Sequence, residues 1–529
     1  MQATSPLTGR ARRARQSPGA RSAAGPGESP VSTRALHGLG ALGLLGVFTS
    51  VFLLTAGAAS VPTQYVPARS GGWPSWLAGP LEGLGVGIGS ASFQTLTLIM
   101  AASYVAVLLA ARTLSGRALW VTIIAAHLVL LLGPPLISQD VFGYLDFARL
   151  GALHGLDPYT HVAAQAPTDT VYLFVGWPFQ NSPYGPLFTL GSYALVPLGV
   201  AGGLWALKAL AVATSLAAIA LVTRASGKEA LSEKHSARVA AACERESRSP
   251  RTVLDGHSPR FTAAFVGLNP VLLELAVGGD HNDTLLLLAL AGALLFTAGA
   301  SPRFRAGAVA LVAGIGIKVT AGLALPFLLL APPAARERLR VVGAAGLSLA
   351  ALAVVGLIGF GSHAFGFASA VSEQQQLVAT HSIPAETARL VGLHGTPSWW
   401  RHCFLAGFVL VFAFALWRTL RGADWRVAAG WSTLALLLCT AWLLPWYAIW
   451  ALPLAAVSGD RRLRAATLVL CAYALLIHLP LANGLLSPQH VTCHTRKDCV
   501  PGGGFRIGGH RIHLTGLKVP DDVTLDLRR

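Results

Sequence analysis

The sequence predicts an all-α polytopic membrane protein, and two features of the chain carry this prediction. Of its 529 residues, 53% are hydrophobic and only 12% are charged, a balance that excludes the soluble globular classes. The apolar residues gather in runs long enough to cross a bilayer, and the basic residues fall in short segments between them. The formal net charge of +17 is therefore explained by loops on the inner side of a membrane rather than by a surface for nucleic acid.

The N-terminal part of the chain predicts a tail followed by three crossings. Residues 1–35 are rich in Arg, Ser, Pro and Gly and have no apolar face, so we expect a disordered basic tail in the cytoplasm. The apolar run at about 36–59 is long enough to span, which favours an uncleaved signal anchor over a signal peptide. Spans at about 92–111 and 118–137 then bring the chain to the outer side.

Residues 187–224 decide the topology, because they contain enough apolar length for two spans. A proline and a cluster of glycines break the first half, and two crossings would place the basic insert at 225–260 outside, against the positive-inside rule. We therefore expect a half-embedded or surface helix at 187–202 and a single crossing at 204–223. The insert at 225–260 is then cytoplasmic.

The second half of the chain continues the alternation, with arginine in each inner turn. Lys318 lies in the middle of the apolar run 306–331, and a buried cation within one long helix is unfavourable. We therefore expect two short spans that meet at an outer lysine. The other crossings are expected at about 262–279, 284–300, 341–360, 402–420, 427–444, 447–458 and 465–484.

The expected transmembrane domain covers 36–484 and contains about 13 crossings. Because an odd number of crossings returns the chain to the outside, the polar tail at 485–529 is expected there. Cys493 and Cys499 in this tail are expected either to form a disulfide, which an outer compartment permits, or to remain two free thiols.

Two long polar segments, 138–186 and 361–400, are expected as outer loops, because backbone and charged groups this dense cannot lie in hydrocarbon. In the first loop, aromatic and aliphatic residues recur at helical spacing. This spacing favours ordered amphipathic helices at the membrane surface over disorder.

Four polar residues stand out on the expected outer side: Asp140, His281, Asp283 and Lys318. A carboxylate, a histidine and a cation walled by apolar spans suit a substrate that is part lipid and part sugar. A lipid phosphate needs a cation, and an acceptor hydroxyl needs a base. Each residue also has a structural alternative, because the acidic residues and His281 could cap the following helices and Lys318 could extend to the membrane interface.

The remaining conspicuous residues are expected to be structural. We expect Asp146 and Asp157 to be solvated or to lie in turns, the latter because it precedes a proline. Aromatic residues at the outer side are expected in the interfacial belt, with sugar or lipid contact as the less favoured alternative. These aromatics are Trp399, Trp400, Trp446 and Tyr447.

Five segments stand in a fixed order along the chain and contain the four outer polar residues. They are SQDVFGYLDFARLGALHGLDPY at 138–159, NSPYGPLF at 181–188, LNPVLLELAVGGDHND at 268–283, IKVTAGLALPFLLL at 317–330 and LPWYAIWALPL at 444–454. In this order they resemble the C-type, polyprenol-phosphate-dependent glycosyltransferases. Within that superfamily, the chain is most similar to the actinobacterial α(1→6)-mannosyltransferases of the Mpt type.

The resemblance implies a GT-C fold whose first large outer loop is catalytic, with Asp140 as the catalytic base. Lys318, aided by Arg149 or Arg389, would stabilise the leaving lipid phosphate. The full set of expected substrate-binding residues is Lys318, His281, Asp283, Tyr144, Arg149, Tyr184 and Arg389. The basic insert at 225–260 and the tail after 485 are not parts of the shared pattern.

The expected reaction is an inverting transfer on the outer face of a bacterial plasma membrane. Asp140 would deprotonate a hydroxyl of a glycolipid or lipoglycan acceptor as this hydroxyl attacks the anomeric carbon of polyprenyl-phosphate mannose. The lipid-linked donor takes the place of a cofactor, no residue is assigned to a metal, and no nucleic acid is expected as a partner. Two alternatives stay open: another polyprenyl-phosphate sugar, such as a pentose or glucose, and a polar-lipid transporter or flippase, which an internal repeat would favour.

Overall fold

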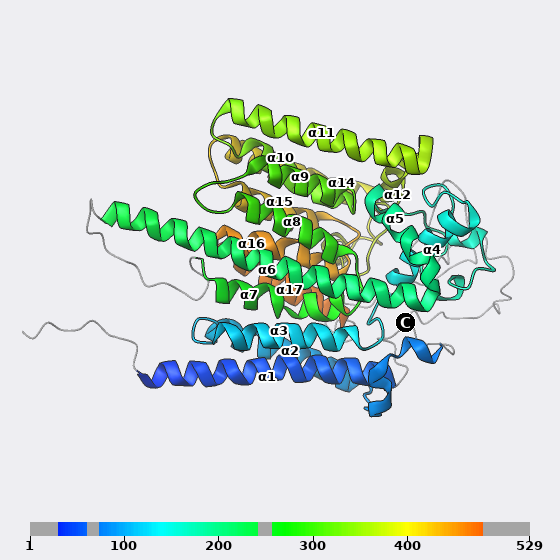
Figure 1. Cartoon of the computed structure of the whole chain (residues 1–529), viewed down its shortest axis with the longest axis horizontal. Helices are drawn as coiled ribbons and strands as arrows, with labels where there is room; N and C mark the ends of the chain where they lie inside the picture. Colours follow the sequence, from blue (N-terminus) through cyan, green and yellow to red (C-terminus); the bar gives the residue numbers. More distant parts are fainter. Residues whose placement is uncertain (1–29, 61–73, 242–256, 480–529) are drawn as a thin grey trace, which may run out of the picture.

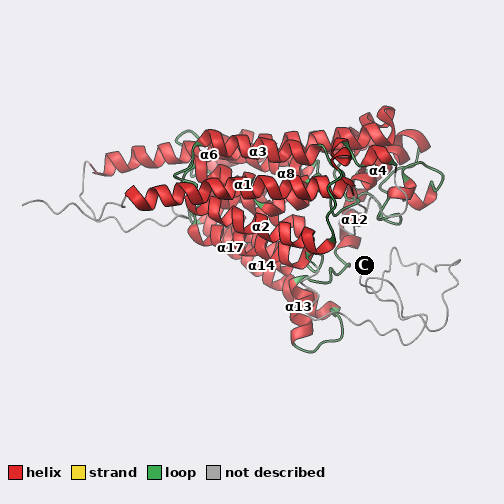
Figure 2. Ribbon diagram, turned by 90° about the horizontal axis from the view of Figure 1, so that it is seen from below, coloured by secondary structure: helices red, strands yellow, loops and turns green. Residues whose placement is uncertain are grey.

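The computed structural model describes residues 30–60, 74–241 and 257–479, and all regular structure in these ranges is helical (Figures 1 and 2). Five described helices are long and apolar enough to cross a membrane, and a sixth span results if one bent helix pair is counted. A polytopic membrane protein is thereby confirmed. Several other apolar helices have only 10–17 residues, so the number of about 13 crossings stays a prediction.

The first three helices pack together along one side of the molecule (Figure 1). They are α1 (Pro30–Ser60), α2 (Ser90–Ala110) and α3 (Gly116–Leu131). A Cβ atom at Gly43 or Gly46 of α1 would collide with Ser103 of α2, so these glycines let the two helices approach closely. α1 begins six residues inside the expected tail 1–35, and residues 1–29 lie outside the described part of the chain.

Short helices gather at one end of the molecule, which we call the loop end (Figure 1). It contains α4 (Asp140–His154), α5 (Pro186–Ser192) and α12 (Gly366–Gln374). The expected helical order of the first loop is confirmed by α4, whose inner face buries aromatic and aliphatic side chains. The two long loops touch one another here, because Asp157 Oδ2 lies 3.0 Å from His363 Nδ1 and the rings of Tyr159 and Phe360 are 4.5 Å apart.

The segment 187–202 is a short helix followed by a 3₁₀ turn (Tyr193–Leu198), and Gly199 with φ 67° separates this turn from α6 (Gly199–Ala241). The expected break before α6 is therefore present, and the single crossing at 204–223 stays a prediction. The first part of the insert at 225–260 continues α6 as helix up to Ala241, and its cytoplasmic location stays a prediction. Residues 242–256 of the insert lie outside the described ranges.

The span expected at 262–279 is not one straight helix. α7 (Pro259–Gly267) and a π-helix (Val271–Val277) meet at an angle of 44°. The cause is Asn269-Pro270, because proline lacks the N–H that would continue the helix and Asn269 instead accepts a hydrogen bond from the Val271 N–H at 3.0 Å. The π-helix ends directly before Gly278 and delivers the chain to the loop end.

The expected break at Lys318 is present between two short apolar helices, whereas their crossing of the membrane stays a prediction. α9 (Phe304–Ile315) ends just before it, and a 3₁₀ turn (Val319–Ala324) with α10 (Leu325–Leu330) follows it. The remaining helices are α8 (Asp283–Thr297), α11 (Ala335–Phe360), α13 (Ile383–Leu390), α14 (Ser398–Leu420), α15 (Trp425–Cys439), α16 (Leu452–Ser458) and α17 (Arg461–His478). α11 and α14 are the least buried of the long helices, as expected for helices that face lipid.

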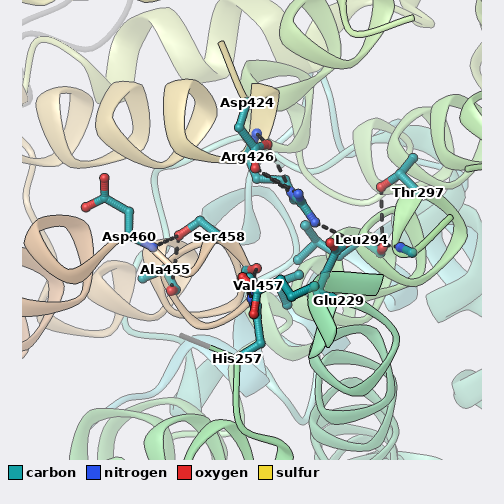
Figure 3. Close-up of polar contacts among 12 residues, drawn as sticks. Glu229, His257, Leu294, Thr297, Asp424, Arg426, Ala455, Val457, Ser458 and Asp460 are labelled. Atoms are coloured by element: carbon teal, nitrogen blue, oxygen red, sulfur yellow. Dashed lines mark hydrogen bonds and ion pairs between the residues drawn. The ribbon is translucent and has the colours of Figure 1, made fainter. Parts of the chain in front are cut away.

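A polar cluster ties α6 to its neighbours near the end opposite to the loop end (Figure 3). Glu229 lies 30 residues after the start of α6, which is roughly 45 Å along the helix. Its carboxylate forms an ion pair with Arg426 and accepts a hydrogen bond from the Gly299 N–H at 2.8 Å. Arg426 also donates to Asp424 at 2.8 Å, so the cluster joins α6 to the turns before α15 and after α8.

Candidate active site

Four segments that are far apart in the sequence meet at the loop end. Asp140 opens α4, His281 and Asp283 stand directly before and at the start of α8, and Lys318 stands between α9 and the 3₁₀ turn that follows. Trp446 comes from a 3₁₀ turn (Pro445–Ala451) that precedes α16. The structure therefore brings together the four polar residues that the sequence analysis singled out.

Asp140 and His281 form the centre of this arrangement. Asp140 Oδ2 lies 3.3 Å from His281 Nδ1, and the carboxylate remains 17% exposed while the imidazole is fully buried. The imidazole is stacked on the Trp446 indole, with 3.9 Å between the ring centroids. His281 Nε2 has no hydrogen-bond partner in the described part of the chain. The aspartate is thus reachable, and its histidine partner is held in one plane.

The pKa of Asp140 lies below the usual value for an aspartate. Burial raises this pKa, but the adjacent imidazole of His281, the charge of Lys318 and the Ser138 hydroxyl lower it by more in total. Asp140 is therefore ionised at neutral pH. An ionised carboxylate with partial exposure can accept a proton from a bound hydroxyl.

Asp283 and Lys318 form a second pair beside the first. Lys318 Nζ lies 2.9 Å and 3.1 Å from the two carboxylate oxygens of Asp283. The Trp450 indole N–H donates to Asp283 at 2.6 Å, and the ammonium lies 4.7 Å from the centre of the Tyr447 ring. The lysine therefore has a fixed position, in which a carboxylate and an aromatic face both stabilise its charge.

Tyr144 and Tyr184 line the same region. Their ring centroids are 5.1 Å apart in an edge-to-face arrangement, and the Tyr144 hydroxyl accepts a hydrogen bond from the Asn282 N–H at 3.3 Å. Burial, reinforced by neighbouring acidic groups, raises the pKa of both phenols well above the usual value. Both hydroxyls therefore stay protonated and can donate hydrogen bonds.

Arg149 and Arg389 are placed in other clusters. Arg149 Nε donates to Asp169 at 2.8 Å, and His154 Nε2 lies 2.7 Å from the other oxygen of the same carboxylate. Arg389 forms an ion pair with Glu386 on α13. The structure does not bring these two arginines into contact with Asp140 or Lys318, so their role at a donor phosphate stays a prediction.

Comparison with known proteins assigns the chain to a family. A family model described as the N-terminal domain of alpha-(1→6)-mannopyranosyltransferase matches residues 41–243 and 252–334, more than half of the chain. The chain belongs to this family. A second family model, the MptB C-terminal domain, matches residues 391–495. The predicted kinship with α(1→6)-mannosyltransferases of the Mpt type is confirmed, and with it the classification as a glycosyltransferase.

Curated relatives in this family come from two actinobacteria. Alpha-(1→6)-mannopyranosyltransferase A of Mycobacterium tuberculosis is 29% identical over 477 residues, which cover 82% of this chain and 83% of the relative. Alpha-(1→6)-mannopyranosyltransferase A of Corynebacterium glutamicum is 28% identical over 213 residues, which cover 39% of this chain and 37% of the relative. No solved structure matches the chain.

Several structural expectations were wrong for this family member. Asp146 is buried rather than solvated, with one oxygen that has no hydrogen-bond partner among the described residues, whereas Asp157 does hold a turn by accepting from the Tyr159 N–H. Trp446 is buried against His281 rather than lying in an interfacial belt, and of the two alternatives left open for Asp283, capping of α8 is not observed, because its carboxylate binds Lys318. Tertiary packing has overridden the local preference in each case.

Sequence reasoning also missed residues that complete the site. Lys208 of α6 pairs with Asp280 at 3.2 Å, and both side chains are almost fully buried. A single lysine within an apolar span is an available signal, because an intramembrane cation usually has a partner. Asn282 and Trp450 gave no comparable signal. Within the described part of the chain, no three His, Cys, Asp or Glu side chains are grouped so that they could hold a metal ion.

Proposed function

We propose that the protein transfers mannose from polyprenyl-phosphate mannose to a glycolipid or lipoglycan acceptor, forming α(1→6) linkages on the outer face of the plasma membrane. The observation that carries this proposal is the 3.3 Å contact between a partly exposed, ionised Asp140 and His281. The family assignment supports mannose as the sugar and α(1→6) as the linkage. The lipid-linked donor is the source of the sugar, and no separate cofactor enters the scheme.

Asp140 acts as the general base in this proposal. Its carboxylate takes the proton of the acceptor hydroxyl, whose oxygen forms a bond to the anomeric carbon as the bond from that carbon to the phosphate oxygen breaks. The electron pair of the broken bond leaves with the polyprenyl phosphate. Attack from the face opposite to a β-linked phosphate gives an α-linked product. His281 limits the rotation of Asp140 through the 3.3 Å contact between them.

Lys318 is proposed to stabilise the phosphate that leaves. Its ammonium lies at the same end of the molecule as Asp140 and contributes to the low pKa of that carboxylate. A phosphate would share the ammonium with Asp283, which keeps the cation in place when no donor is bound. A small apolar pocket is lined by Leu286, Leu311 and Trp450, and the Trp450 indole also donates to Asp283, so the first part of the prenyl chain is proposed to lie on this side of the lysine.

A transfer assay tests this proposal. Membranes that contain the protein are incubated with an α-mannoside acceptor and, separately, with radiolabelled polyprenyl-phosphate mannose, glucose and pentose. We expect label in the acceptor only from the mannose donor, in a linkage that an α(1→6)-specific mannosidase removes. Transfer of glucose or a pentose instead would support the same chemistry with another donor and would contradict the mannose assignment.

A further inference from the structure

Asn282 has an unsatisfied side chain at the centre of the site. It stands between His281 and Asp283, and the residue is only 4% exposed. Neither the amide oxygen nor the amide nitrogen has a hydrogen-bond partner in the part of the chain that the structure describes. Burying an amide without partners is costly, and folded proteins leave few such groups. A side chain of this kind points to a ligand.

Asn282 is not explained by a role in helix capping. It occupies the N-cap position of α8, where asparagine is among the preferred residues, but its side chain makes no capping hydrogen bond. The backbone around it is held from two sides. Asp280 adopts a left-handed conformation, with φ 56°, and is paired with Lys208, while the Asn282 N–H donates to the Tyr144 hydroxyl. The backbone that carries the amide is therefore fixed.

A small pocket adjoins this amide. It lies between α4, α5, α6 and the start of α8, and its lining includes Asn282, His281, Tyr144 and Phe188. His281 Nε2 is also without a partner among the described residues. The polar atoms without a partner are thus the nitrogen and oxygen of the Asn282 amide and one imidazole nitrogen of His281. They lie next to the aromatic side chains of Tyr144 and Phe188.

We propose that the amide of Asn282 binds two adjacent hydroxyl groups of a hexose, either the donor's mannose or the terminal sugar of the acceptor. This proposal rests on the proposed function and assigns a sugar contact within that site. Each sugar hydroxyl both donates and accepts, so a vicinal pair matches an amide, whose nitrogen donates and whose oxygen accepts. A phosphate or carboxylate is a poorer match, because it only accepts and would leave the amide oxygen unpaired.

Equilibrium binding tests this assignment without requiring turnover. The probes are a radiolabelled short-chain polyprenyl phosphate mannose and a radiolabelled α(1→6)-linked mannotriose. Asn282→Ala removes the amide, and Asn282→Leu keeps its approximate volume in case the smaller side chain impairs folding. Ser432→Ala is the matched control, because the Ser432 hydroxyl on α15 is also fully buried without a partner in the described part of the chain but lies outside the site.

We expect Kd for one probe to rise about 10- to 100-fold in both Asn282 variants, which corresponds to the loss of two neutral hydrogen bonds, and to stay unchanged in Ser432→Ala. A higher Kd for the lipid-linked probe would mean that Asn282 binds the donor sugar. A higher Kd for mannotriose would mean that it binds the acceptor sugar. We also expect the unliganded Asn282 variants to melt no lower than the parent protein, since a capping role would lower the melting temperature. Unchanged Kd for both probes would overturn the proposal.

Donor and acceptor analogues that each lack one hydroxyl identify the contact. An analogue that lacks a hydroxyl bound by Asn282 should bind the parent protein more weakly than the complete sugar does. In Asn282→Ala, the same analogue and the complete sugar should bind equally well. If every analogue loses the same affinity in the parent protein and in Asn282→Ala, the proposal is also overturned. If the parent protein instead binds and transfers a glucose or pentose donor, and its Kd depends on Asn282, the proposed function fails while the amide contact stands.

Discussion

At the level of single residues, a bound substrate has to share the charged side chains of the site with protein groups. Lys318 lies within 3.1 Å of both oxygens of Asp283, so a donor phosphate has to share one ammonium with a carboxylate. Breaking such a buried pair leaves an uncompensated charge, and this is costly. The pair is therefore expected to persist when the donor binds, with Asp283 setting the position of the lysine and the lysine providing the charge.

Lys318 can be tested by two substitutions. Lys318→Ala should weaken donor use by at least about 10-fold, because the phosphate loses its cation and Asp283 is left unpaired. Lys318→Arg should retain more activity, since a positive charge survives with altered geometry. The measurement is kcat/KM for the donor, with the melting temperature as a check of folding. Unchanged donor kinetics in Lys318→Ala would leave the lysine only a structural role.

Asp146 should make the stability of the first loop depend on pH. Burial, together with the nearby charge of Asp169, raises the pKa of Asp146 to about 7 in the folded protein, against about 3.9 in an unfolded chain. Its contribution to stability is fully present below about pH 4 and is lost as the pH rises through about 7. Melting temperatures at pH 5 and pH 8 should therefore differ less in Asp146→Asn than in the parent protein. Equal differences would contradict this assignment.

Sequence reasoning found the polar side chains that meet at the candidate site better than the side chains that hold them. Asp140, His281, Asp283 and Lys318 were predictable, because a topology based on charge placed them on one face. Asp280 and Lys208 were missed, since their pairing depends on how α6 packs against the loop before α8. The position of Lys208 within an apolar span indicates that it has a partner, but no local pattern identifies Asp280 as that partner.

Among the elements, the turn that carries Lys318 depends on the segment before α5. The Gly185 N–H donates to the Ile317 carbonyl at 2.9 Å, and the Leu187 N–H donates to the Gly316 carbonyl at 2.8 Å. These bonds run between backbones, so they fix the turn whatever its side chains are. A Cβ atom at Gly185 would meet the backbone of Gly316 at 2.5 Å, which only a shift of one segment can relieve.

Gly185→Ala should therefore displace the Lys318 turn. We expect lower transfer activity, with a loss of about 10-fold or more and a lower melting temperature, because backbone atoms cannot rotate away as side chains do. Gly191→Ala on α5 is the matched control, since a Cβ atom there meets nothing within 4 Å and alanine favours a helix. If Gly185→Ala behaves like Gly191→Ala in both measurements, the turn is not held in this way.

Some breaks within the helices could be predicted from the sequence pattern and others could not. Asn269-Pro270 lies inside an apolar run of spanning length, and hydropathy alone does not distinguish a straight helix from α7 followed by a π-helix. The break around Lys318 was predictable, because a cation within an apolar run has a clear physical cost. The helical continuation of α6 to Ala241 was not predicted, since the basic residues of the insert were used only to assign a side of the membrane.

For the whole molecule, the proposed reaction requires the loop end to face outward. Cysteines introduced one at a time at Gln165 and Gln375 of a cysteine-free variant should react with an impermeant thiol reagent applied to intact cells. A cysteine at His235 on the extension of α6 should not react until the membrane is opened. All three positions are exposed, so burial does not account for a difference. Labelling at His235 from outside would reverse the orientation and place the site in the cytoplasm.

The central claim is that Asp140 is the base of a mannosyl transfer, and transfer by Asp140→Asn tests it most directly. The amide cannot accept the proton, so transfer from polyprenyl-phosphate mannose should fall by about 10²- to 10⁴-fold, while donor binding and expression are retained. Asparagine caps helices as well as aspartate does, so a structural role would leave transfer nearly normal. A well-expressed Asp140→Asn protein that transfers mannose at close to the parent rate would contradict the account.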